Sequence, residues 1–177
     1  MTPNILIETV AYHDVRRLAN ISLSGNVRHM LYDLKHPKFV HVKAVDRATA
    51  EILGYISVWY IGFEPKDTGN RARRTMGADM ERWQKFLMPE GAKCIVVAGF
   101  QVAPAMQGKG VGTALMKSVT DEADRHGVYM WVHSSEGAFN SYQKSGFETV
   151  GELDVDLDTY APAPPPAGGK WGHYLIR

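Results

Sequence analysis

The sequence predicts one α/β (α+β) domain in which strands alternate with amphipathic helices. An apolar run rich in β-branched residues, Cys94–Val102, is typical of a largely buried strand. A glycine-rich turn separates this run from a segment whose apolar residues share one helical face, and Gly127 follows where such a helix would end. Two further apolar segments, residues 39–45 and 52–61, flank a short polar turn and predict an antiparallel hairpin.

The composition of the chain limits the classes of protein to which it can belong. The chain has 177 residues, 45% hydrophobic and 22% charged, which is ordinary for a globular domain with a core of its own. Its formal net charge of +1 argues against a general nucleic-acid binder or a membrane-surface binder. The single cysteine, Cys94, lies in an apolar strand and fits a reducing compartment. No apolar stretch of about 18 residues and no secretory signal are visible, so we expect a cytoplasmic protein, with a homodimer left open.

The segments around this centre are less regular. Residues 1–36 predict a divergent, helical N-terminal part, because residues 5–7 make a poor strand. Residues 62–91 predict a polar insertion with a helix over residues 78–87, which Pro89 ends. After the central helix we expect a strand, a helix, a strand, a proline-rich hairpin loop and a last strand, over residues 128–134, 136–144, 147–157, 158–170 and 171–176.

The glycine-rich turn has the chemistry of an anion site. Gly108, Gly110 and Gly112 lie where the central strand gives way to the helix. Glycine allows a ligand to approach the backbone, and the first N–H groups of a helix have no intrahelical partner and lie at the positive end of its dipole. Such a turn can bind a phosphate or pyrophosphate, and Lys109 adds a cation that either reaches the phosphate or only faces solvent. The glycine spacing fits neither a Walker P-loop nor a dinucleotide fingerprint.

What this turn resembles is the acetyl-coenzyme A signature of the GNAT-type N-acetyltransferases, Gln/Arg-x-x-Gly-x-Gly/Ala. Gln107, Gly110 and Gly112 match its fixed positions, after the Val-x-Pro ending of a strand. A lone match of six residues is weak evidence, because a glycine-rich turn can also be packed for shape alone. A second match, further along the chain and in the order that the family has, strengthens the assignment.

That second stretch, residues 135–147, resembles the family's signature after its fifth strand. Tyr142, Lys144, Gly146 and Phe147 fall in register, with Ser135 at the Asn/Ser position and Ala138 at the small position. Ser141 and Gln143 depart from the usual leucine and glutamate, and neither is the position at which the family places its catalytic tyrosine. The resemblance covers residues 39–177 and is firmest over residues 94–157.

The resemblance implies the GNAT fold, a central mixed, mostly antiparallel and twisted sheet with a parallel, splayed strand pair and helices on both faces. It also implies an N-acetyltransferase that moves an acetyl group from acetyl-CoA to an amine by direct attack in a ternary complex. A backbone N–H near Val102 would polarise the thioester carbonyl. The residues implied to bind the coenzyme are Val102, Gln107, Gly108, Lys109, Gly110, Val111, Gly112, Thr113 and Ser135.

Two titratable residues are candidates for catalysis. The family places a tyrosine at Tyr142, where it can donate a proton to the leaving thiolate; the alternative is an amphipathic tyrosine that only packs. His133, near the end of the fifth predicted strand, is the best-placed general base; the alternatives are that it is a hydrogen-bonded strand histidine without a catalytic role, or that a chain of waters takes the proton without a dedicated side chain. His41 and His173 belong to no motif, and we assign them no role. No Cys/His cluster has metal spacing, so no metal is expected.

The acceptor is expected to be a small-molecule or peptide amine, and the sequence does not identify it. A second hypothesis is a non-catalytic acyl-CoA-binding or sensing module on the same fold, because fold alone does not fix function. A third, a nucleotide-binding oxidoreductase, is disfavoured by the glycine spacing.

Overall fold

The computed structural model describes residues 3–21, 31, 33–63, 85–86, 91–156 and 173–176. Most of the insertion predicted for residues 62–91, including most of its helix, lies outside these residues, as does the proline-rich loop at 158–170. The chain divides into two compact units, residues 1–74 with 88–132 and residues 75–87 with 133–177, and each is described by itself. In the described part of the chain, no helix is long and apolar enough to cross a membrane.

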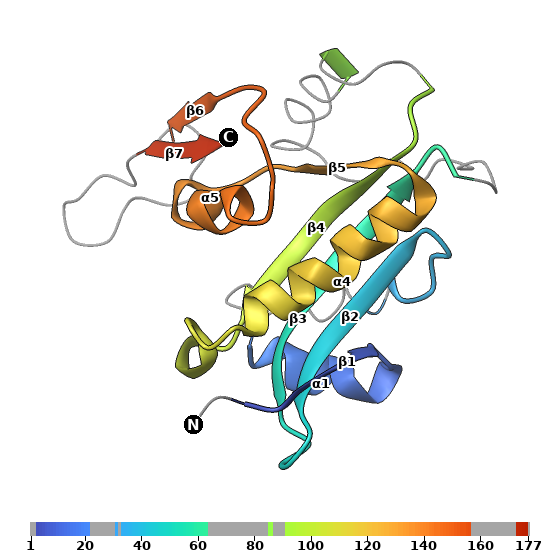
Figure 1. The fold of residues 1–177 in the computed structure, drawn as a ribbon, viewed down its shortest axis with the longest axis vertical. Coiled ribbons are helices and arrows are strands. Elements are labelled where there is room, and N and C mark those ends of the chain that lie inside the picture. The colour runs from blue at the N-terminus through green and yellow to red at the C-terminus, as the bar shows by residue number, and fades with distance from the viewer. Residues whose placement is uncertain are drawn as a thin grey trace. The chain divides into compact units, whose positions relative to one another are not determined.

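The first unit contains a five-stranded sheet in the order β1-β2-β3-β4-β5 (Figure 1). The strands are β1 (Ile5–Thr9), β2 (Phe39–Asp46), β3 (Ile52–Ile61), β4 (Cys94–Val102) and β5 (Tyr129–Val132). The first four pair antiparallel with their neighbours, and β4 and β5 pair in parallel. The predicted hairpin of residues 39–45 and 52–61 is confirmed as β2 and β3. The expected mixed, mostly antiparallel sheet is therefore present.

The N-terminal segment corrects one prediction. Residues 5–7, expected to be helical, belong to β1, which pairs along β2 from Ile5 opposite Asp46 to Thr9 opposite Val42. Helix begins only afterwards, as the 3-10 turn η1 (Tyr12–Asp14) and the short α1 (Val15–Ala19). The physical reason is tertiary: a short apolar run gains backbone hydrogen bonds from a strand edge that lies far away in the sequence.

Helices cover both faces of this sheet. A Cβ built on Gly54 of β3 would lie 3.3 Å from Leu115 Cδ1 of α4 (Val111–His126), so this side of β3 faces α4. Tyr55, the next residue, points to the opposite face and packs in one cluster with Leu18 of α1. Figure 1 shows α4 over the sheet, with its axis running along much the same line as β4. The predicted helix after the glycine turn is confirmed, and Gly127 ends it with a left-handed φ of 62°.

The second unit holds α5 (Glu136–Gln143) and a two-stranded antiparallel sheet of β6 (Leu153–Asp156) and β7 (His173–Ile176). The helix predicted over residues 136–144 is confirmed, and Gly146 follows it with a left-handed φ of 88°. The strand predicted for residues 147–157 is too long, because residues 147–152 are not strand. An alternating pattern alone does not make a strand, and β7 provides ladder partners only for Leu153–Asp156.

Candidate active site

The turn between β4 and α4 needs glycine for its backbone. The chain leaves β4 at Val102, passes through the 3-10 turn η2 (Pro104–Met106), and enters α4 after Gly110. Gly108 and Gly110 have φ angles of +73° and +83°, in the left-handed region that L side chains rarely adopt. A Cβ added at either position meets no described atom within 4 Å. Backbone geometry, not crowding, therefore selects glycine, and the space beside this backbone is open to a ligand.

The N-terminus of α4 presents unpaired donors at this turn. Ala114 is the first residue of α4 whose N–H reaches back to the turn, donating to the Gly110 carbonyl at 3.0 Å. The N–H groups of Val111, Gly112 and Thr113 thus have no acceptor within the helix. Gly110, at the N-cap, carries no side chain to cap them, and no acidic residue lies in the first turn. The resulting site carries the positive end of the helix dipole, with no carboxylate in the first turn of α4.

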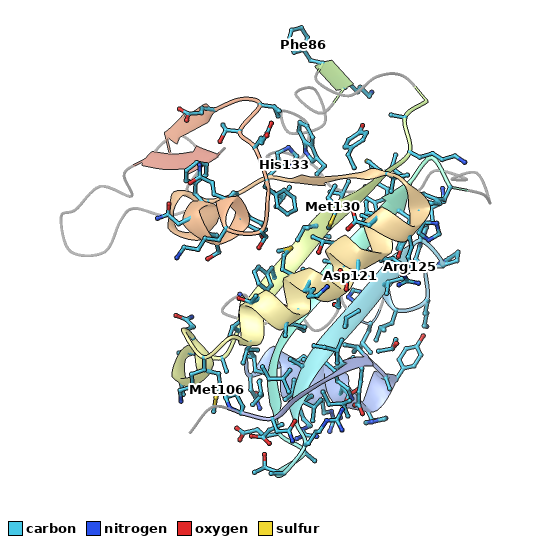
Figure 2. The ribbon with its side chains drawn as sticks, viewed as in Figure 1. Phe86, Met106, Asp121, Arg125, Met130 and His133 are labelled. Carbon is cyan, nitrogen blue, oxygen red and sulfur yellow. The ribbon has the colours of Figure 1, made fainter. Side chains whose placement is uncertain are left out.

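Around this N-terminus the side chains are exposed. Gln107, Lys109 and Thr113 all lie open to solvent at the turn. Figure 2 shows Met106 beside this end of α4, with Arg125 toward the other end of the helix. The Lys109 ammonium makes no ion pair with the described residues, so it is available to a phosphate bound at the turn.

Gly112 brings the start of α4 close to the end of β4. A Cβ on Gly112 would lie 3.3 Å from Phe100 Cζ and 3.6 Å from Val102 Cγ2. Val111 and Leu115, both fully buried, anchor the same end of the helix in the core. The helix N-terminus is thereby held at the carboxyl end of the central strand, which is where ligands of open α/β sheets bind.

Strand β4 has an open edge just before the turn. β5 pairs only with Cys94–Val97 of β4, whereas β3 continues to pair as far as Val102. The register shifts between Ser57 opposite Gly99 and Val58 opposite Val97, which leaves Ala98 as a bulge where β5 stops pairing. The β4–β5 pair is therefore parallel at its start and unpaired over the last five residues of β4, as far as the described residues show.

The direction of the β4 amides follows from one hydrogen bond. The Ala103 N–H donates to the Leu53 carbonyl at 2.8 Å, so this residue directs its backbone groups toward β3. Backbone groups alternate in direction along a strand, and those of Val102 and Phe100 therefore point to the opposite, open edge. The Val102 N–H is thus directed away from β3, at the carboxyl end of the open edge and next to the glycine turn.

The other sequence-predicted site residues belong to the second unit. Ser135 is the N-cap residue of α5, with no side-chain cap hydrogen bond, and Tyr142 lies near the end of the same helix. Tyr142 is buried, at 7% exposure, and its ring meets Phe147 edge-to-face at 5.4 Å. The Phe147 N–H donates to the Tyr142 carbonyl at 3.2 Å, which fixes the chain after α5. Of the site residues predicted from the sequence, Val102 and residues 107–113 therefore lie in the first unit, and Ser135 and Tyr142 lie in the second.

His133 follows β5 directly in the chain and is labelled in Figure 2. Burial holds the pKa of its imidazole below the usual range, so the ring is neutral near pH 7 and can accept a proton. Among the described residues, no group of three or more His, Cys, Asp or Glu side chains could hold a metal ion.

His41, to which the sequence assigns no role, is placed by the structure in the interior of the sheet. It is 3% exposed, and its Nδ1 lies 2.6 Å from the Ser57 hydroxyl oxygen on the neighbouring strand. The sequence signal for a buried polar residue was a histidine within the alternating pattern of the strand over residues 39–45. Its partner could not be found from sequence, because the His41–Ser57 contact depends on the register of β2 against β3.

Comparison with known proteins agrees with this geometry. The family model of the acetyltransferase (GNAT) domain matches residues 88–156, which span β4, the turn, α4, β5, α5 and β6. An acetyltransferase from Trypanosoma brucei is similar in structure, with a TM-score of 0.58 and 18% identity over 84% of this chain and 95% of that one.

Two plant structures are also similar. NAA60 from Arabidopsis thaliana, solved with a bisubstrate analogue, has a TM-score of 0.63 and 16% identity over 98% of this chain and 96% of that one. Glucosamine-6-phosphate N-acetyltransferase from Arabidopsis thaliana has a TM-score of 0.56 and 12% identity over 84% of this chain and 94% of that one. At these identities the likeness shows the fold, and the family model adds the signature region. Residues 88–156 of this chain thus match the acetyltransferase (GNAT) domain, and the chain shares the fold of these acetyltransferases.

Proposed function

We propose that the protein is an N-acetyltransferase that uses acetyl-CoA as its acetyl donor and transfers the acetyl group directly to an amine in a ternary complex. One observation carries the proposal: the open edge of β4 runs straight into the glycine turn at the N-terminus of α4. The open edge offers backbone groups that can pair with amides, and the turn that follows it offers N–H groups that can bind a diphosphate. Coenzyme A carries amides in its pantetheine arm and, next to that arm, a pyrophosphate, so its groups would match those of the protein in the same order.

The chain's residues fit this ligand without crowding. Gly108 and Gly110 leave space beside the turn with no described atom within 4 Å of an added Cβ, and the N–H groups at the start of α4 would donate to a diphosphate bound there. Phe100 and Val102 would pair through their backbone groups with the amides of the pantetheine arm. A carboxylate in the first turn of α4 would repel a diphosphate, and that turn contains none.

Coenzyme A supplies an activated acyl group as a thioester and a thiolate leaving group. A backbone N–H near Val102 on this open edge, at Phe100 or at Val102 itself, would stabilise negative charge that develops on the carbonyl oxygen during attack, a contribution typically worth about 3 kcal/mol for one such donor. Tyr142 would give a proton to the departing sulfur, because a phenol of ordinary pKa near 10 can protonate a thiolate. His133, neutral near pH 7, is one candidate to take the amine proton.

The test has two parts. Titration calorimetry with acetyl-CoA and with NAD should give binding of the first alone. Release of free thiol should then require both acetyl-CoA and an amine from a panel of small amines and short peptides. Absence of acetyl-CoA binding would refute the proposal, whereas tight binding with no thiol release over the whole panel would replace it with an acyl-CoA-binding module.

A further inference from the structure

Three neighbouring strands place polar side chains on the sheet face opposite α4. Gly54 faces α4, so Tyr55, Ser57 and Trp59 of β3 point to the other face. His41 of β2 lies opposite Ser57, and Gln101 of β4 lies opposite Tyr55, so both side chains are on this same face. All of these residues belong to the first unit.

Three buried polar atoms on this face have no hydrogen-bond partner among the described residues. They are His41 Nε2, Trp59 Nε1 and Gln101 Oε1. Buried polar atoms are almost always hydrogen bonded, and each exception calls for an explanation. Three exceptions on adjacent strands and one face indicate a polar ligand that this part of the sheet is built to bind.

Gly99 leaves space at the middle of this face. Among the described residues, a Cβ built on Gly99 would meet only Ser57 within 4 Å, at 3.8 Å from its Cβ and 3.9 Å from its Oγ, which is ordinary contact. Gly99 also comes directly after the Ala98 bulge, where β5 stops pairing with β4. A small group could therefore rest on the β4 backbone here, beside the His41–Ser57 pair and at the start of the open edge.

We propose that the acceptor amine binds over Gly99 on this face, with Gln101 Oε1 accepting a hydrogen bond from its nitrogen and His41 Nε2 removing its proton. This inference rests on the proposed acetyl transfer. Trp59 Nε1 can only donate, so it would bind an oxygen of the acceptor. The pattern fits a primary amine that carries a neutral hydrogen-bond-accepting oxygen close to the nitrogen, such as an amide or a hydroxyl group.

The charges around His41 support a neutral base. Burial lowers the pKa of His41, and the nearby Asp33 carboxylate opposes this and raises it, with a net decrease. Lys43, next on the same face of β2, is held by Asp14 at 2.7 Å and by Glu8 at 3.4 Å, so it does not offer a free cation for an acceptor carboxylate. The His36 ring meets Phe39 edge-to-face at 5.6 Å between ring centroids, and the Phe39 ring in turn stacks on His41 at 6.2 Å.

The proton balance of the step is complete. The amine loses a proton to His41 Nε2, its nitrogen lone pair forms the C–N bond, and the C–S bonding pair leaves with sulfur. A proton from Tyr142 or water then neutralises the sulfur. The nitrogen's remaining excess proton and the one on His41 pass to solvent, which leaves an amide, a free thiol and one net proton from each ammonium consumed.

The substrate class is tested with three simple acceptors. Glycinamide carries the required oxygen, propylamine lacks it, and glycine replaces it with a carboxylate. In the thiol-release assay, kcat/KM for glycinamide should exceed that of the other two at least tenfold. Equal values, or turnover of other amines but not of glycinamide, would overturn the substrate class.

The site is tested with Gly99→Ala and Gly99→Val, which add one and three carbons at a position without a left-handed φ. Acetyl-CoA Kd should stay within about twofold, while KM for glycinamide should rise progressively and at least tenfold for the valine variant. An unchanged KM with intact acetyl-CoA turnover would refute this site and leave the proposed function standing. Loss of acetyl-CoA binding by the wild-type protein would instead refute the proposed function.

The role of His41 has its own readout. In His41→Gln, the acidic limb of the kcat/KM pH profile should disappear and kcat should fall at least a hundredfold, whereas His13→Gln, at an exposed histidine, should match the wild type. If His41→Gln does not fold, the Nε2 chemical shift of wild-type His41 should still change when glycinamide is added to the protein saturated with coenzyme A. An unaltered limb, or an unchanged shift at saturating glycinamide, would overturn this assignment.

Discussion

The Lys43 ammonium on β2 lies 2.7 Å from the Asp14 carboxylate at the start of α1, and both side chains are almost completely buried. The Ala11 N–H also donates to this carboxylate, at 2.9 Å. The pair ties the N-terminal segment to the sheet. Burial acts to raise the pKa of Asp14, but the Lys43 and Ala11 hydrogen bonds outweigh it and hold the pKa below its ordinary value.

Removing one member of this pair should destabilise the protein strongly. Asp14→Asn leaves a buried ammonium with a weaker partner, and about 3 kcal/mol of the free energy of unfolding should be lost. Urea unfolding followed by circular dichroism measures the change. Lys117→Gln, at an exposed ion pair on α4, is the matched control and should cost less than about 0.5 kcal/mol. Equal effects of the two substitutions would contradict the structural role of the buried pair.

The same pair gives a pH dependence with a definite sign. Because the folded pKa of Asp14 is lowered, its contribution to stability is complete above the unfolded pKa near 4 and is lost as the pH falls through the lower, folded value. The difference in unfolding free energy between wild type and Asp14→Asn should therefore shrink below about pH 4. A difference that stays constant from pH 6 to pH 3 would contradict this linkage.

Gly54 marks a close approach between β3 and β4. A Cβ at this position would lie 2.6 Å from the Gln101 carbonyl oxygen and 3.1 Å from Val102 Cα, both backbone atoms that cannot step aside. Gly54→Ala should therefore destabilise the fold by about 2 kcal/mol. Gly137→Ala, at an exposed helical glycine with no described atom within 4 Å, should be neutral or stabilising by about 0.5 kcal/mol. Thermal unfolding of the two variants checks the contrast, and equal melting temperatures would contradict it.

How much of this molecule the sequence predicts depends on how local each feature is. The centre of the fold was predicted because its signals lie within one short stretch: the apolar run of β4, the glycines of the turn and Gly127 at the end of α4. β1 was missed because its partner lies far along the chain, with Ile5 opposite Asp46. A three-residue apolar run does not by itself indicate which distant strand will pair with it.

The candidate site divides in the same way. The residues proposed to bind the coenzyme share a sequence motif at the turn, and Gly108 and Gly110 in that motif have the left-handed φ angles that glycine allows. The face that carries His41, Ser57 and Gly99 has no motif, because its members come from three strands and meet only through register. A one-residue shift of any of these strands would send its side chains to the opposite face.

Gly110 allows the backbone and the charge of the turn to be tested separately. Gly110→Ala imposes about 1–2 kcal/mol of strain at a left-handed φ but leaves the charge unchanged. Gly110→Glu adds the same strain and sets a carboxylate at the start of α4, where it would repel a diphosphate. By calorimetry, the Kd for acetyl-CoA should rise up to about tenfold in the alanine variant and at least a hundredfold in the glutamate variant. Equal Kd values would show that charge at this turn does not govern binding.

Cys94 should not interfere with a thiol-release assay. It is fully buried in β4, and burial raises the pKa of its thiol to about 11, with a hydrogen bond from Tyr129 opposing the shift. At pH 8 only about one thiol in a thousand would be ionised even if a reagent could reach it. Ellman's reagent should therefore leave the native protein unlabelled and find one thiol per chain in guanidinium chloride. Rapid labelling of the native protein would contradict the burial of Cys94.

Tyr142 provides the sharpest division between chemistry and packing. Its ring is buried against Phe147, so Tyr142→Phe keeps the packing and removes only the hydroxyl group. If that hydroxyl protonates the leaving sulfur, kcat should fall at least tenfold, while the Kd for acetyl-CoA and the melting temperature stay close to wild type. Tyr12→Phe, at an exposed tyrosine, should leave all three quantities unchanged. A leaving group of lower pKa needs less protonation, so the defect of Tyr142→Phe should also shrink with an acetyl thioester of a more acidic thiol. Wild-type turnover by Tyr142→Phe would remove its role as an acid, and a defect that is equal for both thioesters would assign the hydroxyl to a step other than thiolate departure.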